Sequence, residues 1–502
     1  MREKILVVSI VTVVGILTTL TIGYLTVEPL TGTFILLAGL LSAILIALLL
    51  KNIRFAIPLL IVLAPITFVS WFIIKIDTGG RPFMGILLIV EVTTIVIFPC
   101  LLLYKSIVKG KPGIVGKKIY QGNLNIILFI LMGWIFLSIL WSPSTLGSLY
   151  STALFFIHFF MYLTFITLIK TEQDLNMVVR TFFIMATVIA ATMLISVLPV
   201  KILAIEKTYF FADWFNLKVI FNGDNMRATG LTDEKTASEF VGFGILVSLL
   251  LLSYAKDEKR KYLLVCLLIL LSFAVLFAQS KSATIGLLIG ILILSIVINR
   301  IRAHFIRNLF RFTTVFILIF GIFLITQSIL LSYRGINKEQ LLATSYVSSS
   351  GARDSVETRE NWWNTCYKDM VHNNAYLYGL GIGGCGYNIN LAAKEQIAYV
   401  ANPHSAYFSL FFDLGLIGVF LFLLLILLSG IKVCRLMRDL EDGFEKDMLW
   451  VFLCCAVITG VVAVTEKSYY QNVSIWVLSG IGVSAFRLVS SKQSELIKHS
   501  KK

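Results

Sequence analysis

Four basic residues stand at intervals between residues 227 and 404 and could act on one anionic substrate. Arg227, Lys281 and Arg359 lie in polar segments between apolar runs, and His404 directly precedes a long apolar run. Arg presents a planar fork that matches phosphate oxygens, and Lys presents a point charge. His can accept a proton near neutral pH. These residue types point to a phosphate or diphosphate site beside a general base.

Each of these residues also has an ordinary structural explanation. Lys and Arg are common where helices leave a membrane, because their long side chains reach the polar headgroups. A histidine at the start of a helix often only packs against a loop. For each residue taken singly, the structural explanation is at least as good as the chemical one, so their order and surroundings must decide.

The composition indicates a membrane protein. The chain has 502 residues, of which 58% are hydrophobic and 14% charged, and its mean hydropathy is +0.89. A soluble protein carries roughly 25% charged residues. A helix crosses the bilayer core with about 20 apolar residues. We therefore expect an all-α polytopic membrane protein with about 14 spans, near residues 5–27, 30–50, 54–74, 83–104, 123–141, 150–169, 180–200, 236–255, 262–278, 283–299, 312–332, 405–430, 448–465 and 473–490.

The basic residues predict the orientation of these spans. If the N-terminus is cytoplasmic, the segments on that side hold roughly two thirds of the 43 Lys and Arg residues. The net charge of +15 is then a positive-inside signature, and no nucleic acid partner is required. We expect both termini in the cytoplasm. The predicted division is transmembrane helices with short loops in 1–332, an extracytoplasmic loop in 333–404, and three helices with a cytoplasmic tail in 405–502.

The long loop contains a helical pattern followed by a glycine-rich stretch. Four residues at helical spacing share one face: Arg359, Trp363, Cys366 and Met370. Gly379 to Gly386 is too rich in glycine for a helix interior, which predicts a tight turn back to the membrane. Cys366 and Cys385 either form a disulfide or remain two thiols, and the sequence favours neither. No C-x-x-C motif occurs, so we expect no zinc site.

Two acids lie within the apolar runs, Glu91 and Asp413. Acids inside a membrane are candidate functional residues. In a continuous helix, Asp413 faces away from His404, because nine residues correspond to two and a half turns. We therefore expect Asp413 to bond a neighbouring helix, with Gly415 and Gly418 allowing a close approach.

The order of these motifs resembles the O-antigen ligase/polymerase superfamily over about residues 225–430. The motifs, in chain order, are Arg227-Ala228-Thr229-Gly230, Ser280-Lys281-Ser282-Ala283, Arg359 with Trp363, Gly379-Leu380-Gly381-Ile382-Gly383, and His404-Ser405 running into Asp413-Leu414-Gly415-Leu416-Ile417-Gly418. The resemblance implies an all-helical GT-C-type glycosyltransferase that needs no metal or other cofactor. Such enzymes use undecaprenyl diphosphate-linked glycans on the outer face of the bacterial cytoplasmic membrane.

The resemblance also assigns expected roles to single residues. Arg227 and Arg359 would bind the diphosphate, and His404 would act on the acceptor hydroxyl. Lys281, Arg353 and Trp363 are the expected substrate-binding residues. Lys281 stands where the superfamily often has Arg, so it keeps the charge and loses the bidentate fork.

Members of the superfamily differ in the acceptor. Polymerases pass the glycan to another lipid-linked repeat unit, and ligases pass it to lipid A core. We expect a polymerase, with a ligase as the alternative and a chain-length regulator and a flippase as partners. The hypotheses from other classes are a flippase for lipid-linked oligosaccharides and a non-catalytic scaffold. Neither needs a loop of about 70 residues that carries an Arg–His set on one face.

Overall fold

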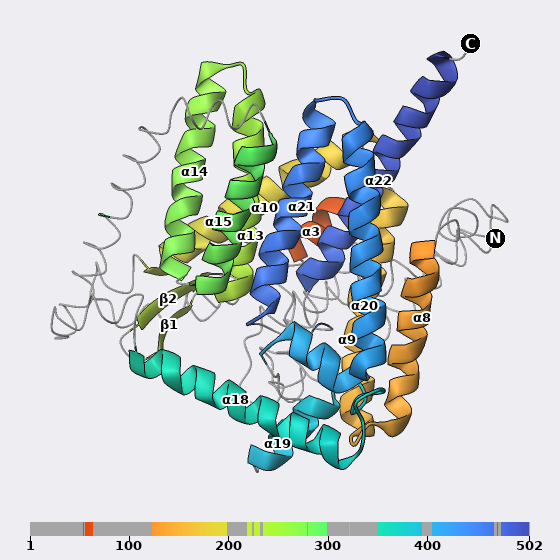
Figure 1. Ribbon diagram of the computed structural model, residues 1–502. Helices are drawn as coiled ribbons and strands as arrows, with labels where there is room; N and C mark the ends of the chain where they lie inside the picture. The colour runs from red at the N-terminus through yellow and green to blue at the C-terminus, as the bar shows by residue number, and fades with distance from the viewer. Residues whose placement is uncertain are drawn as a thin grey trace, which may run out of the picture.

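The computed structural model describes residues 54, 56–63, 123–197, 218–222, 225–230, 234–278, 280–298, 321, 349–393, 404–465, 469 and 473–500. Most of the helices run side by side in a bundle, and one long helix lies across an end of it (Figure 1). The bundle helices are α3 (Ala56–Leu63), α8 (Asn123–Leu137), α9 (Thr145–Leu168), α10 (Glu172–Val197), α13 (Glu234–Tyr254), α14 (Glu258–Ala278), α15 (Lys281–Val297), α20 (Ala406–Asp439), α21 (Phe444–Ala463) and α22 (Val473–Ser500). A 3-10 turn, η4 (Ser138–Trp141), extends α8.

Six of the described helices are long and apolar enough to cross a membrane. They are α9, α10, α13, α14, α20 and α21, and α8, α15 and α22 carry shorter apolar stretches. Large apolar side chains such as Leu288, Leu292 and Phe420 are exposed on their outer surfaces, as contact with lipid requires. The protein is therefore a multi-pass membrane protein. The predicted spans at 5–27, 30–50 and 83–104 lie outside the described residues, as do Glu91 and all of 312–332 except Gly321.

The two ends of the bundle differ in what they carry (Figure 1). The short connections 255–257 and 440–443 lie at one end, together with the C-terminus. At the opposite end lie α18 (Ser349–His372), α19 (Gly384–Ala393) and a β-hairpin. All the candidate site residues that the structure describes come from this second end.

Side chains satisfy the backbone at several helix ends. At the start of α10, Thr171 and Asp174 form a reciprocal cap, since the Asp174 carboxylate accepts from the Thr171 N–H at 2.9 Å and the Thr171 hydroxyl accepts from the Asp174 N–H at 3.2 Å. Arg54 pairs with the same carboxylate at 3.5 Å. Arg487 donates to the carbonyls of Ile166 and Ile169 at the end of α9. These contacts fix the ends of α9 and α10 at the end of the bundle opposite α18.

The β-hairpin is a feature that the all-α prediction missed. Strand β1 (Lys218–Asn222) pairs antiparallel with β2 (Asn225–Gly230), and Ile220 lies opposite Arg227. The strands pack against α10, α13 and α14. The two residues between the strands in the sequence are Gly223-Asp224, a known signal for a two-residue hairpin loop, so the hairpin could have been predicted.

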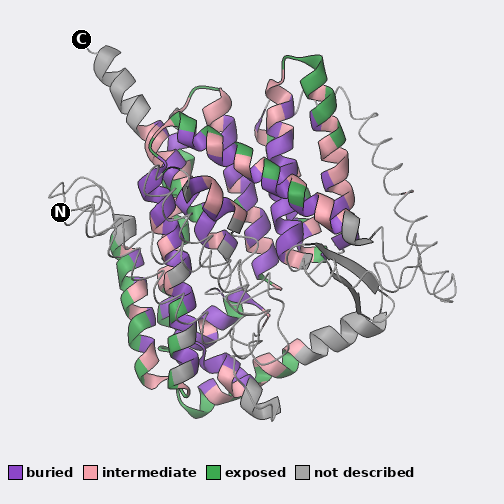
Figure 2. Cartoon of the chain, turned by 180° about the vertical axis from the view of Figure 1, so that it is seen from behind, coloured by how far each residue is buried: buried purple, intermediate pink, exposed green. Residues whose placement is uncertain are grey.

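Buried side chains form three clusters, and Figure 2 shows them concentrated inside the bundle. The largest joins α10, α13, α14, α15, α21 and α22 around Phe182, Phe240 and Phe243. A second joins α8, α9, α20 and α22 around Phe155 and Trp476. The third lies under α18 and attaches it to α19 and to the start of α20; its members are Cys366, Met370, Ala375, Leu380, Cys385, Ile389 and Phe412.

Candidate functional site

His404 lies immediately before α20, in a backbone conformation that is unusual for a residue other than glycine. Its φ is 51°, in the left-handed region, which His tolerates better than most residues. The helix begins at Ala406, and the Ser405 hydroxyl caps it by accepting from the Phe408 N–H. Such conformations are costly and concentrate at functional sites.

The imidazole of His404 is held against α18. It stacks on the indole of Trp362, with ring centroids 5.2 Å apart and 17° between the planes. One residue further along, Trp363 stacks on Phe408 at 4.3 Å. Two adjacent tryptophans of α18 thus stack on residues that flank Ser405 at the start of α20.

Two cations act on the imidazole. Partial burial, then the positive charge of Lys235, then that of Arg359 lower the pKa of His404 from 6.5 to about 4. Lys235 comes from the start of α13 and Arg359 from α18, so the site joins three separate elements. His404 is therefore neutral at pH 7, with a ring nitrogen able to accept a proton or a hydrogen bond.

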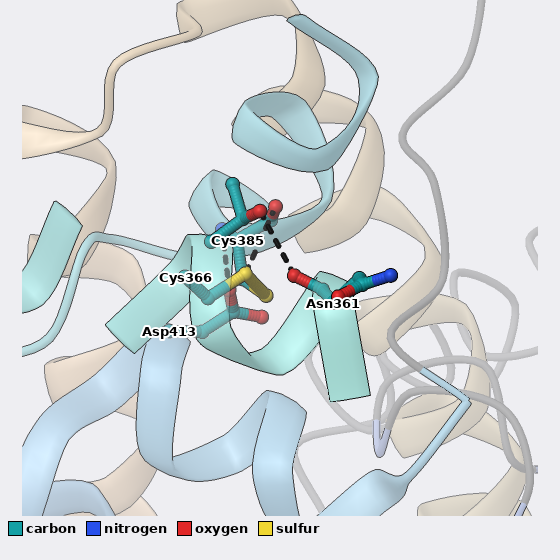
Figure 3. The surroundings of a disulfide bond; sticks show 5 residues. Asn361, Cys366, Cys385 and Asp413 are labelled. Atoms are coloured by element: carbon teal, nitrogen blue, oxygen red, sulfur yellow. Dashed lines mark hydrogen bonds between the residues drawn. A yellow bond between two sulfur atoms is a disulfide. The ribbon is translucent and has the colours of Figure 1, made fainter. Parts of the chain in front are cut away.

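A disulfide fastens α18 to α19. Cys366 and Cys385 are bonded with an S–S distance of 2.08 Å, which resolves the question that the sequence left open (Figure 3). Cys366 and Met370 are fully buried, and Trp363 is partly buried. The predicted shared face of the loop helix is confirmed, because these residues turn towards the protein.

Helix α20 is broken at Gly415, where the sequence predicted a continuous helix. Gly415 has φ 66° and ψ −168°, and a Cβ built there would lie 2.4 Å from the carbonyl oxygen of Leu377. The helix has 34 residues and is about 50 Å long, more than the ~30 Å bilayer core requires. The part before the break is mostly buried in protein, whereas Leu416, Phe420 and Leu423 after it are exposed. The apolar helix begins at Ala406, next to His404 as predicted, but the break divides it into a part buried in protein and a part with exposed apolar side chains.

The loop between α18 and α19 supplies hydrogen-bonding partners for the backbone of α20 at the break. In an unbroken helix the N–H groups of Leu416 and Ile417 would bond the carbonyls of Phe412 and Asp413. Here those two carbonyls accept from the loop residues Leu380 and Gly381 at 2.7 and 2.9 Å. The N–H groups of Leu416 and Ile417 donate to the loop carbonyls of Tyr376 and Leu377, at 2.9 and 3.1 Å. The four backbone bonds replace helical ones, so the exchange costs no buried hydrogen-bonding group.

Three glycines of this loop have a positive φ, which other residues rarely adopt. Gly379, Gly381 and Gly383 have φ of 77°, 85° and 74°, and a Cβ on Gly379 would lie 2.4 Å from the carbonyl oxygen of Asp413. The expected tight turn is confirmed for Gly379–Gly383. From Gly384 onward the chain is helical, so the prediction of no helix through Gly386 is wrong.

Asp413 bonds a neighbouring helix, as predicted. Its side chain is only 1% exposed. The carboxylate accepts from the backbone N–H of Cys385 at 3.3 Å and from that of Gly383, at the start of α19 (Figure 3). A carboxylate there is favourable, because the free N–H groups of a helix start carry partial positive charge. Asp413 therefore fixes α19, and through the disulfide it also fixes α18.

The remaining predicted residues are placed as follows. Lys281 is exposed at the first position of α15, whose Gly286 packs on Ile458 of α21, so it lies at the same end of the bundle as His404. Arg227 is in β2 and Arg353 is in α18, and the side chains of both lie outside the described part of the chain. The structure thus brings His404 close to α18, the helix that carries Arg359.

Two residues of the site were missed by the sequence reasoning. Trp362, which was not among the predicted site residues, contacts the imidazole. Lys235 was overlooked because it lies in a short polar run before an apolar stretch and looks like an ordinary boundary lysine. Only its contact with a distant helix end distinguishes it, and no local pattern encodes that contact.

The fold and the site define a multi-pass membrane protein in which α18, linked to α19 by a disulfide, packs against a histidine at one end of the bundle. Residues 264–423 match the Wzy_C family model, described as O-antigen ligase. This match confirms the resemblance to the O-antigen ligase/polymerase superfamily, and the matched residues include α18, α19, His404 and the break in α20. No curated protein matches the chain.

Proposed function

We propose that the protein is a membrane glycosyltransferase that polymerises undecaprenyl diphosphate-linked oligosaccharide repeat units into a cell-surface polysaccharide. One observation carries this proposal. A neutral imidazole stacks on Trp362 of α18 in the field of two cations, Arg359 and Lys235, and it lies within the segment that matches the O-antigen ligase family model.

The proposed reaction uses these groups as follows. The oxygen of the acceptor hydroxyl bonds to the anomeric carbon of the donor sugar, and the bond from that carbon to the diphosphate oxygen breaks. The hydroxyl proton passes to His404. The diphosphate departs with the bonding electron pair on its lipid carrier. Attack opposite the leaving group inverts the anomeric configuration.

Arg359 and Arg227 stabilise the departing diphosphate. Fixed cations aimed at a developing negative charge can supply the stabilisation that other enzymes obtain from a metal ion. Lys281, Arg353 and Trp363 bind other parts of the substrate. Trp362 holds the imidazole in place by stacking.

We place this site on the outer face of the bacterial cytoplasmic membrane, with fourteen spans and both termini in the cytoplasm. Two observations support the placement. The end of the bundle that carries α18 holds the disulfide, and structural disulfides belong to oxidising compartments. The opposite end carries exposed Lys256, Arg260 and Arg438, as the positive-inside rule expects of a cytoplasmic face.

Two alternatives remain to be separated. A ligase would use the same donor site and differ only in the acceptor, which would be lipid A core. A flippase would carry the lipid-linked unit across the membrane without forming a glycosidic bond. Neither a chain-length regulator nor a flippase partner is needed for the transfer itself.

The test uses purified protein in liposomes with lipid-linked repeat units. The wild type should extend the glycan by whole repeat units, and His404→Ala and Arg359→Ala should abolish extension. Lys368→Met is the matched control, because Lys368 is an exposed cation on the same helix as Arg359. It should extend chains at the wild-type rate.

The outcomes distinguish the hypotheses. Transfer only to added core lipid identifies a ligase, and transbilayer movement without any transfer identifies a flippase. Loss of extension on adding a chelator would contradict the metal-independent mechanism. Full activity of His404→Ala would remove the proposed role of the imidazole.

A further inference from the structure

Lys235 is fixed at the end of the bundle where His404 lies. Its ammonium group donates to the carbonyl of Thr465 at 3.1 Å, just beyond the end of α21. The start of α20 is bound to the same end of α21, because the Tyr407 hydroxyl donates to the Gly460 carbonyl at 3.0 Å. Lys235 and His404 are therefore both attached to the last turn of α21 and its continuation.

A buried carboxylate fixes the helix that carries Lys235. Glu239 lies one turn further along α13, is 2% exposed, and accepts from the hydroxyls of Thr459 on α21 and Ser474 on α22. These bonds link α13, α21 and α22 at one level. The position of Lys235 relative to the site is thus set by a polar network and does not depend on a mobile side chain alone.

The proposed reaction requires His404 to accept a proton, which the positive charges near it oppose. An imidazole in the field of two cations resists a third positive charge, and a general base must accept one. Two charged groups that lower its pKa are Lys235 from α13 and Arg359 from α18. Both are cations, so an anion that binds beside them would make His404 a better base.

We propose that Lys235 is a further donor-site residue that binds the diphosphate of the lipid-linked glycan together with Arg359, and that this bound anion makes His404 a competent base. The inference rests on the proposed function. A diphosphate between the two cations neutralises their field at the imidazole and adds a negative charge beside it. Acceptor activation then follows donor binding.

A binding experiment tests the role of Lys235 without requiring turnover. Farnesyl diphosphate serves as a short donor-like probe, and farnesol is its uncharged control. Wild type and Lys368→Met should bind the diphosphate equally, whereas Lys235→Met should bind it about 10- to 100-fold more weakly. Lys235→Arg, which keeps the charge, should retain most of the affinity and show that the site still folds.

The outcomes separate this inference from the proposed function. If Lys235→Met binds as tightly as wild type while Arg359→Ala binds weakly, the role of Lys235 is refuted and the proposed function stands. If wild type binds farnesyl diphosphate no better than farnesol, the diphosphate site and the proposed function fail together.

A titration of His404 tests the second half of the inference. In labelled protein, the imidazole signal that disappears in His404→Gln should titrate at a higher pH when farnesyl diphosphate is bound, by at least about one unit. In Lys235→Met without ligand the midpoint should already be raised, because one of the two cations is gone. An unchanged midpoint on diphosphate binding would overturn the coupling between the anion and the base.

Discussion

Replacing Gly415 by Ala tests whether the break in α20 holds the site together. The substitution places a Cβ 2.4 Å from the carbonyl oxygen of Leu377, at a backbone conformation with φ 66° that side chains other than glycine avoid. The helix can relieve both the steric clash and the unfavourable backbone conformation by becoming continuous. The carbonyls of Phe412 and Asp413 would then recover their helical donors, and the loop before α19 would lose all four of its bonds to α20.

The cost can be worked from these contacts. Keeping the native backbone with Ala at this position costs ~1–3 kcal/mol for the strained conformation alone. Escaping into a straight helix gives up four loop bonds at ~1 kcal/mol each and regains two helical ones, a net loss of ~2 kcal/mol. The chain takes the less costly route, so we expect destabilisation by at most ~2 kcal/mol, concentrated in α18, α19 and the segment that carries His404.

The assay combines thermal unfolding in detergent, limited proteolysis of the loop and glycan extension in liposomes. Gly415→Ala should melt lower, expose residues near 375–393 to protease and lose most of its activity. Gly430→Ala on the same helix is the matched control, because no atom lies within 4 Å of a Cβ built there. It should be neutral or slightly stabilising. Wild-type stability and activity in Gly415→Ala would refute the claim that the break positions His404.

Two further predictions concern the histidine and the disulfide. Because the pKa of His404 is lowered from 6.5 to about 4, the unfolded chain binds a proton between these values that the folded chain does not; the melting temperature of the wild type should therefore fall more steeply between pH 7 and 4 than that of His404→Gln, and parallel curves would contradict the lowered pKa. The disulfide spans 19 residues, so the double variant Cys366→Ser/Cys385→Ser should lose ~3 kcal/mol of stability, whereas replacing the exposed free thiols Cys266 and Cys434 should leave the melting curve unchanged.

Much of the membrane architecture could be predicted from the sequence, for a simple reason. A backbone in lipid must satisfy its hydrogen bonds within the segment, so an apolar run of about 20 residues has few options besides a helix. The predicted spans at 236–255 and 448–465 accordingly match α13 and α21 within a few residues. The hairpin was missed although its turn residues were visible, because the surrounding helices dominated the interpretation.

Within the site, local periodicity succeeded where the relevant contacts were local. The spacing of Trp363, Cys366 and Met370 gave the correct buried face of α18, since helical geometry alone decides which residues share a side. The prediction that Asp413 bonds a neighbouring helix was also confirmed, although its premise of a helix continuous from His404 was wrong, because α20 begins at Ala406. Neither inference needed knowledge of a partner element.

The sequence by itself indicated a multi-pass membrane protein, the face of the loop helix that is buried and the residue types that could hold a diphosphate. Only the tertiary structure decided that Trp362 contacts His404, that Lys235 approaches it and that α20 breaks at Gly415. Each of these depends on a partner more than 30 residues away in the chain. The backbone groups of Phe412 and Asp413 could have bonded within the helix or to the loop, and only the assembled fold supplies the donors that make the second arrangement favourable.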